Sequence, residues 1–180
     1  MSKPLSTAML VGVVASIPAS KIKALTERPL QRAAEALWPP TLQDKELVGA
    51  DPTGHPENMP PAVLAGRVAS RLGHEPLAVS RSLQIQNVVH YGFGALSGVA
   101  YGILACTRPS VTVGAGSGAG AAIYLAGQGT ALPLLRVQAP PWHLPRAAFA
   151  WEFASHLLFG LVLEYVRRSA TTLLTLESPA

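Results

Sequence analysis

Two long stretches of the chain contain no charged side chain. No Lys, Arg, Asp or Glu lies between Arg81 and Arg108 or between Arg108 and Arg136, and these stretches hold 26 and 27 residues. A helix that crosses a bilayer needs about 20 apolar residues, and a buried helix of a soluble protein rarely runs as far without a polar face. The pattern predicts membrane-spanning helices over about 88–106 and 111–132, joined as an antiparallel hairpin by a short turn that contains Pro109.

A further apolar stretch predicts a span over about 147–166, interrupted by Glu152 and followed by Arg167 and Arg168. The segment before it, 138–146, contains three prolines and Trp142. Aromatic side chains of this kind are enriched at membrane–water interfaces, so we expect a rigid loop that is anchored there.

The N-terminal segment allows two interpretations. Residues 5–20 carry no charge, with Lys3 before them and Lys21 and Lys23 after them. Lysines at a helix end can extend their stems to the interface, which predicts a span over about 5–21. The alternative is a cleaved signal peptide with a basic start, an apolar core and small residues before Lys21, although Pro18 lies in the would-be cleavage site. The count is therefore four spans, or three if the segment is removed.

Between the first two spans, residues 22–86 form a predicted Pro-rich extramembrane loop. It contains Pro29, Pro39, Pro40, Pro52, Pro56, Pro60, Pro61 and Pro76. Apolar residues recur at helical spacing from Pro29 to Leu37 and from Pro61 to Leu72, which predicts two short amphipathic helices along the membrane surface. Residues 51–58 between them have the composition of turns, and we expect a solvated connector there.

The composition agrees with a single all-α membrane domain over residues 1–180. Hydrophobic residues make up 49% of the chain and charged residues 13%, against about 25% charged residues in soluble domains. The apolar content excludes a wholly disordered chain, and the single cysteine, Cys106, excludes a disulfide scaffold. We therefore predict an integral membrane bundle of four helices with a Pro-rich amphipathic loop between the first and second.

Glycines recur at every fourth position of the second span. Gly94, Gly98 and Gly102 share one helix face, a glycine zipper that lets another helix backbone approach closely. Gly114 and Gly118 offer a matching smooth face on the third span, so we expect these two helices to pack together. The run from Gly114 to Ala119 also imitates a dinucleotide fingerprint, but no acidic residue lies between Glu75 and Glu152, which argues against nucleotide binding.

Three ionisable side chains form a candidate polar cluster inside the bundle: His90, Glu152 and His156. Glu152 and His156 lie one helical turn apart, so their side chains share a face. Three readings stay open, namely a hydrogen-bonded pair that locks helix packing, a proton-relay site, and a metal site with His90 as third ligand. No H-E-x-x-H or C-x-x-C motif is present, so the sequence predicts no specific metal site and no cofactor.

Several short motifs resemble the YagU-like family of small bacterial inner-membrane proteins of unknown function. They are Trp38-Pro39-Pro40, Asn58-Met59-Pro60-Pro61, His90-Tyr91-Gly92-Phe93-Gly94, Gly98-x-x-Tyr101-Gly102, and a last span with Glu152 and His156. The resemblance implies a multi-pass protein of the bacterial inner membrane and brings with it no reaction, cofactor or catalytic residue.

These observations predict where the protein acts more closely than what it does. We expect a structural or accessory membrane component that acts by helix packing, with the lipid bilayer and a homo-oligomer or larger membrane complex as partners and no nucleic acid. No nucleophile with a recognisable base is apparent, so we expect no enzymatic activity. The alternative is a proton- or ion-handling membrane protein that uses His90, Glu152 and His156.

Overall fold

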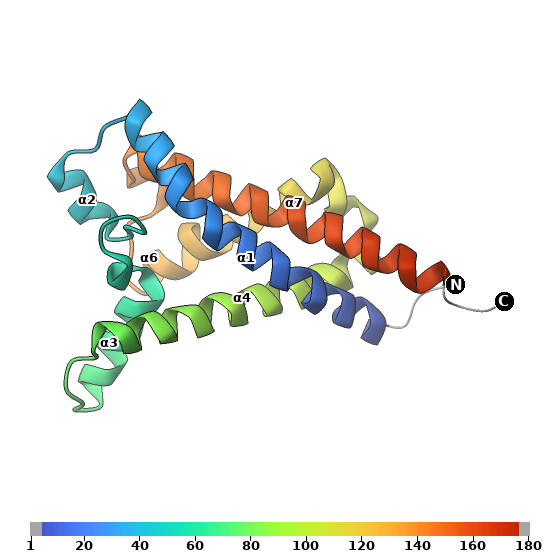
Figure 1. The fold of residues 1–180 in the computed structure, drawn as a ribbon, viewed down its shortest axis with the longest axis horizontal. Coiled ribbons are helices and arrows are strands. Elements are labelled where there is room, and N and C mark those ends of the chain that lie inside the picture. Colours follow the sequence, from blue (N-terminus) through green and yellow to red (C-terminus); the bar gives the residue numbers. More distant parts are fainter. Residues whose placement is uncertain (1–4, 177–180) are drawn as a thin grey trace. The chain divides into compact units, whose positions relative to one another are not determined.

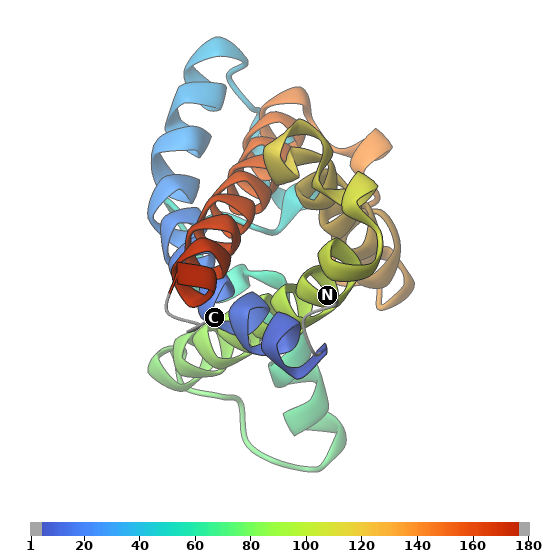
Figure 2. The ribbon, with the colours of Figure 1, turned by 90° about the vertical axis from the view of Figure 1, so that its right-hand side faces the viewer.

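The computed structural model describes residues 5–176 of the chain. Within that range the regular structure is helical, apart from an isolated bridge between Asp51 and His55. Figures 1 and 2 accordingly show coiled ribbons joined by loops. The all-α fold class is confirmed.

The first helix, α1, runs without interruption over Leu5–Leu37. We expected a span that ends near residue 21 and a new helix from Pro29, but residues 22–37, assigned to the loop, continue the first helix. Pro18 and Pro29 each lack the N–H that would bond to the preceding turn. Ala, Leu, Glu, Arg and Gln dominate the residues after Lys23, and their high helix propensity carries the helix through these two positions.

The connection that follows contains two short α-helices and one 3₁₀ turn. α2 covers Leu42–Val48 and begins with a capping box, in which Thr41 and Asp44 each accept a hydrogen bond from the other's backbone N–H. Gly49 ends it with a positive φ of 69°. The 3₁₀ turn η1 covers Pro56–Asn58 and α3 covers Pro60–Arg71, close to the second predicted amphipathic helix.

α4 covers Val79–Thr107 and is longer than the predicted span over 88–106. The additional N-terminal residues include Arg81, Gln84 and Gln86, which the hydropathy pattern assigned to the loop. Polar side chains end an apolar pattern but do not end a helix, because the backbone hydrogen bonds continue regardless of them.

The predicted span over 111–132 is not one uniform helix. The 3₁₀ segment η2 covers Pro109–Gly116, with a kink where Gly114 and Ala115 have φ values of 65° and 54°. α5 (Ser117–Ala126), the π-helical turn η3 (Gly127–Ala131) and α6 (Leu132–Leu134) follow. Glycines weaken the start of this segment, and Pro133 lacks an N–H and crowds the carbonyl four residues before it, which favours a wide turn there.

After the 3₁₀ turn η4 (Pro141–His143), α7 covers Arg146–Leu176. Three helices are long and apolar enough to cross a membrane: Leu5–Leu37, Val79–Thr107 and Arg146–Leu174. α7 is the most enclosed of them, because 56% of its apolar window is buried, against 33% for α1 and 28% for α4. The structure thus describes a membrane protein with three such helices, and the predicted span over 111–132 is divided among shorter elements.

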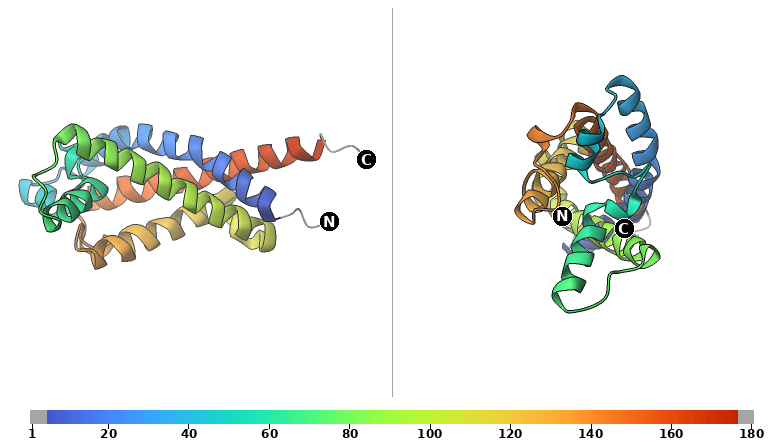
Figure 3. Two further views of the ribbon diagram at one scale, coloured as in Figure 1. Left: turned by 90° about the horizontal axis from the view of Figure 1, so that it is seen from below. Right: turned by 90° about the vertical axis from the view of Figure 1, so that its left-hand side faces the viewer.

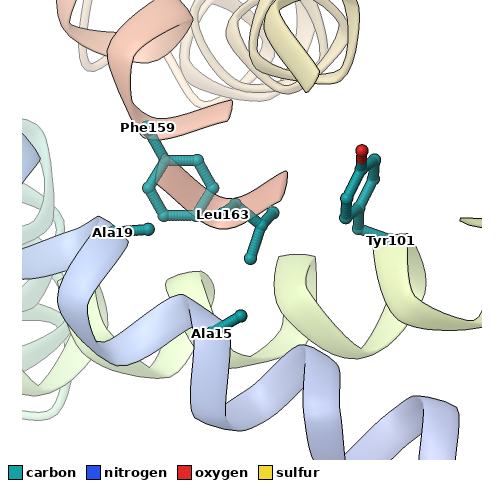
Figure 4. Close-up of a cluster of buried hydrophobic side chains, with 5 residues drawn as sticks. All are labelled: Ala15, Ala19, Tyr101, Phe159 and Leu163. Carbon is teal, nitrogen blue, oxygen red and sulfur yellow. The ribbon is translucent and has the colours of Figure 1, made fainter. Parts of the chain in front are cut away.

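The chain packs as two compact units, and residues 5–25, 91–123 and 155–176 belong to the first. Its core contains Ala15 and Ala19 of α1, Tyr101 of α4, and Phe159 and Leu163 of α7 (Figure 4). All five are at most 3% exposed. The small alanines let the bulky side chains of α7 approach α1, while Tyr101 extends from α4 toward α7.

The second unit contains residues 26–90 and 124–154. It has two apolar clusters where the connecting segments pack on the first turns of α7. Val48, Ala50, Leu144 and Ala148 form one, and Ala34, Ala147 and Trp151 form the other. The loop after α2 and the C-terminal part of α1 are thereby attached to α7 by buried side chains.

Candidate functional site

Two of the three predicted cluster residues are deeply buried on α7. Glu152 is 2% exposed and His156 is 6% exposed, while His90 on α4 is partly buried. Two neighbouring rows of residues at i+4 spacing are buried along α7. The first row is Trp151, Ser155, Phe159 and Leu163. The second row is Glu152, His156, Gly160 and Glu164. The second row places three ionisable side chains on the protected side of the most enclosed helix.

Glu152 accepts a hydrogen bond from a residue outside the predicted cluster. Gln138, which is 7% exposed, donates from its Nε2 to Oε1 of Glu152 at 2.5 Å. Gln138 belongs to the loop that was expected to lie at the membrane interface. An amide in a Pro-rich loop carries no signal of burial, and its contact with α7 depends on how the loop folds back.

Aromatic side chains enclose the neighbourhood of Glu152. Tyr124 of α5 is fully buried and lies close enough to Glu152 to be influenced by its charge. The rings of Phe149 and Phe153 pack edge-on against the Tyr124 ring at centroid distances of 6.1 and 5.3 Å. These contacts fix the tyrosine ring.

Glu164 is the centre of a polar network in the first unit. It is 1% exposed and accepts hydrogen bonds from the Tyr101 hydroxyl at 2.8 Å and from Arg167 Nε at 2.6 Å. Arg168 Nε also donates to it. A buried carboxylate is stable only when it is paired and hydrogen-bonded, and Glu164 meets both conditions. Its contacts hold α4 and α7 together.

Besides the contact of Gln138, the turn that begins at Asp51 was not predicted. Asp51 is 8% exposed, and its Oδ1 accepts hydrogen bonds from Gln31 Nε2 (2.7 Å), Gly54 N (3.0 Å) and Thr53 Oγ1 (2.9 Å). Arg28 Nε donates to the Pro52 carbonyl at 2.9 Å. This segment is therefore docked on α1, which corrects the expected solvated connector.

The electrostatics of this turn favour an ionised carboxylate. Burial opposes ionisation of Asp51, but hydrogen bonds from Gln31, Gly54 and Thr53 and the positive charge of Lys45 outweigh it and hold its pKa below the ordinary value of 3.8. Lys45 Nζ lies 3.3 Å from Glu35 Oε2 and 3.9 Å from Asp51 Oδ2.

An open pocket lies beside this turn, with about 310 Å³ of space including its mouth. Its lining is Gln31, Glu35, Pro40, Asp44, Lys45, Val48, Ala50, Asp51, Pro145, Ala147, Ala148 and Trp151. The carboxylates around it already accept hydrogen bonds from within the protein: Asp51 from its own turn, Asp44 from Thr41 and Glu35 from Gln31. The pocket therefore shows no acceptor that requires a ligand.

The three zipper glycines of α4 face α1. Side chains added at Gly98 and Gly102 would overlap the backbone of Gly12 and Ala8, and one at Gly94 would overlap Ser20. Figure 3 shows the N-terminal part of α1 crossing the C-terminal part of α4. We expected the segment from Gly114 to be the partner of this face, but α1 is.

Gly116 and Gly120 lie against α7, in place of the predicted Gly114 and Gly118. Gly114 lies in the kink, and a side chain at Gly118 would meet only the Val113 carbonyl, at 3.5 Å. Side chains at Gly116 and Gly120 would instead overlap the backbone of Gly160 and His156. The kink at Gly114 breaks the uniform helix that was expected over 111–132, and the two glycines that contact α7 follow it.

Residues 5–176 contain no group of three or more His, Cys, Asp or Glu side chains that is arranged to hold a metal ion. The chemistry available at Glu152 is that of a carboxylate, an amide and a phenol shielded from solvent. Such groups hold a proton or a hard cation, or hydrogen-bond to one another.

Comparison with known proteins gives one match. A family model described as "Protein of unknown function (DUF1440)" matches residues 30–165, most of the chain. No curated protein and no solved structure matches it.

Proposed function

The chain belongs to the DUF1440 family, whose function is unknown, and from this premise we propose that it is a non-enzymatic structural or accessory component of a membrane. It acts by helix packing. The observation that carries the proposal is the direct contact of helix backbones in the first unit. Gly12 meets Gly98, and Gly116 meets Gly160, each without space for a Cβ. Backbone contact of this kind is how helices associate where lipid removes the hydrophobic driving force.

The proposal includes four membrane crossings, with residues 111–132 providing the third. Contacts within the first unit support it. Gly94 lies near Phe159, and Tyr101 bonds to Glu164, so α4 and α7 run in the same direction there. Gly116 lies against Gly160 and Gly120 against His156, so α5 runs opposite to α7. A chain that leaves α4 and enters a parallel α7 must return between them.

We place the protein in the bacterial inner membrane, and what supports this is the likeness to the YagU-like family. The motifs that carry the likeness, from Trp38-Pro39-Pro40 to His156, all lie inside the matched residues 30–165. The bilayer is one partner. A second copy or a larger complex is the other, and because the zipper glycines pack inside the chain, this partner contacts other surfaces.

Affinity purification in mild detergent with mass spectrometry and metal analysis tests the proposal. We expect a stoichiometric membrane-protein partner, or the chain itself as an oligomer, with no transition metal. A monomer that purifies alone and reproducibly would contradict the accessory role. A stoichiometric transition metal would revive an enzymatic one.

The burial of Glu152 and His156 favours a second candidate function, the handling of protons or ions. Ionisable side chains inside a membrane are costly, and those that persist commonly mark ion or proton pathways. Glu152 and His156 lie in one row of α7, and their exposed fractions are 2% and 6%. Purified protein in liposomes with a pH-sensitive or sodium-sensitive dye tests this function. We expect a flux that Glu152→Gln abolishes, and wild-type liposomes as tight as empty ones would rule it out.

A further inference from the structure

The segment from Tyr124 to Phe153 forms a helical hairpin whose turn places an amide beside a buried carboxylate. α6 ends in a Schellman motif, in which Arg136 has a φ of 54° and donates to the Pro133 carbonyl, while Val137 donates to the Leu132 carbonyl. Gln138 is the next residue after this reversal. The position of Gln138 beside α7 is therefore set by a defined turn of the backbone.

The side-chain oxygen of Gln138 has no hydrogen-bond donor among residues 5–176. Gln138 Nε2 donates to Glu152, but Gln138 Oε1 is buried and makes no hydrogen bond within the described residues. A buried acceptor that accepts nothing is costly, and in native proteins such an atom commonly marks a site for a water molecule or an ion. It lies in the same amide group as the donor to Glu152, so both acceptors belong to one enclosed place.

The oxygen atoms here match the ligands of a hard cation. Glu152 supplies a carboxylate, Gln138 an amide oxygen and Tyr124 a phenol oxygen, and hard cations prefer oxygen ligands of these types. A single carboxylate balances a single positive charge, whereas a divalent ion would leave a net charge in an apolar site. Phe149 and Phe153 enclose the tyrosine and limit access of water.

We propose that Tyr124, Gln138 and Glu152, the hairpin site, bind a monovalent hard cation, with sodium as the probe. The proposal deepens the second candidate function and rests on it, since it names the ion that Glu152 would hold. It does not depend on whether the protein has an accessory role.

Thermal unfolding of the full-length protein in mild detergent tests the site. We compare sodium chloride with N-methylglucamine chloride at equal ionic strength, because the organic cation is too large to enter. Saturating sodium raises the wild-type Tm by about 4 °C, as expected for a ligand present at about ten times its Kd. Glu152→Gln removes the rise, and Gln138→Met, which keeps the length but has no amide oxygen, reduces it by at least half.

Two further variants keep the test decisive. Gln43→Met, at an exposed position of α2, responds to sodium as the wild type does. Gln138→Glu adds a second carboxylate and lowers the half-saturating sodium concentration about tenfold, which can be measured even if Gln138→Met does not fold. A wild-type Tm that is equal in both salts overturns the proposal. A Tm that follows pH in N-methylglucamine but ignores sodium also overturns it, and leaves a proton as the ligand of Glu152.

Discussion

At the scale of single residues, the two substitutions of Glu152 separate shape from charge. Glu152→Gln keeps an acceptor for Gln138 Nε2 and, in N-methylglucamine chloride without sodium, is expected to change the Tm by less than about 3 °C. Glu152→Leu leaves that buried amide without its acceptor at 2.5 Å and lowers stability by about 1–3 kcal/mol. Thermal unfolding in mild detergent measures both.

Leu161→Ala, at a 39% exposed position of α7, is the control for changes on the same helix. It is expected to have a small effect. If Glu152→Gln unfolds the protein while Leu161→Ala does not, the carboxylate supports the fold in a way that an amide cannot replace, and the packing reading of Glu152 is wrong.

Asp51 gives the protein a predictable response to acid. Its pKa in the folded chain lies below its ordinary value, so its contribution to stability is present above about pH 4 and is lost as the pH falls through the folded pKa. Asp51→Asn is expected to cost about 1 kcal/mol at pH 7 through weaker hydrogen bonds. The difference from wild type should shrink as the pH approaches 3.

Unfolding curves of wild type and Asp51→Asn between pH 3 and pH 7 check this expectation. Asp44→Asn is a useful comparison, because the Asp44 pKa is also lowered, by hydrogen bonds from the Thr41 backbone and side chain, but at the exposed start of α2. A stability difference for Asp51→Asn that stays constant with pH would contradict the assignment of an ionised Asp51.

The predicted site residues and the unpredicted ones differ in how far along the chain their contacts reach. Glu152 and His156 stand out because an acid and a histidine interrupt an apolar run, and the structure buries both. Gln138 and Asp51 are ordinary polar residues of loops. Their partners lie 14 and 20 positions away, at Glu152 and Gln31, and no local pattern encodes a contact at that separation.

At the scale of elements, the crossing of α1 and α4 depends on the absence of a side chain. A Cβ at Gly98 would overlap the Gly12 carbonyl, whereas one at Gly92 would meet nothing within 4 Å. Gly98→Leu therefore forces two backbones apart and costs at least about 1–3 kcal/mol. Gly92→Leu is neutral or slightly stabilising, because leucine favours a helix more than glycine does.

The yield of folded protein in membranes and the Tm in detergent compare these two variants. Both replace glycine by leucine in α4, so membrane insertion and hydrophobicity change equally. Equal behaviour of the two would show that α1 does not pack on the zipper face of α4.

A second pair of glycines tests the packing of α5 on α7. Gly120 lies against the His156 carbonyl and Gly118 does not. We expect Gly120→Leu to destabilise the protein by at least about 1–3 kcal/mol and Gly118→Leu to be nearly silent. The yield of folded protein in membranes and the Tm in detergent compare these two variants as well. A reversed order would show that Gly118, and not Gly120, faces α7.

Hydropathy predicted where the long helices lie but not where they end. It reports which segments avoid water, so it stopped the first helix at Lys21 and began the second at Val88, while the backbone continues to Leu37 and starts at Val79. The kink at Gly114 and the π-helical turn before Pro133 depend on backbone sterics, to which an average over apolar side chains is insensitive.

At the scale of the whole molecule, the direction of the helices bears on the number of crossings. Tyr101 and Glu164 are joined by a hydrogen bond, and Gly94 lies near Phe159, so α4 and α7 are parallel in the first unit. Two parallel helices that both cross a bilayer need a crossing between them. Three crossings alone would make α4 and α7 antiparallel, and the contacts Gly94–Phe159 and Tyr101–Glu164 could not then form together.

The number of crossings decides on which side of the membrane each connection lies. With four crossings, the N-terminus, the turn at Arg108 and the C-terminus share one side, and the segment between α3 and α4 lies on the other.

Cys106 is exposed near the end of α4 and provides a native probe. Intact spheroplasts and inverted vesicles are treated with a membrane-impermeant maleimide, using the wild type and the variant Cys106→Ser/Ser70→Cys. We expect the two cysteines to be labelled from opposite sides, and a C-terminal tag to be digested by protease from the Cys106 side. A tag that is digested from the Ser70→Cys side would mean three crossings, and residues 111–132 would then lie at the surface instead of spanning the bilayer.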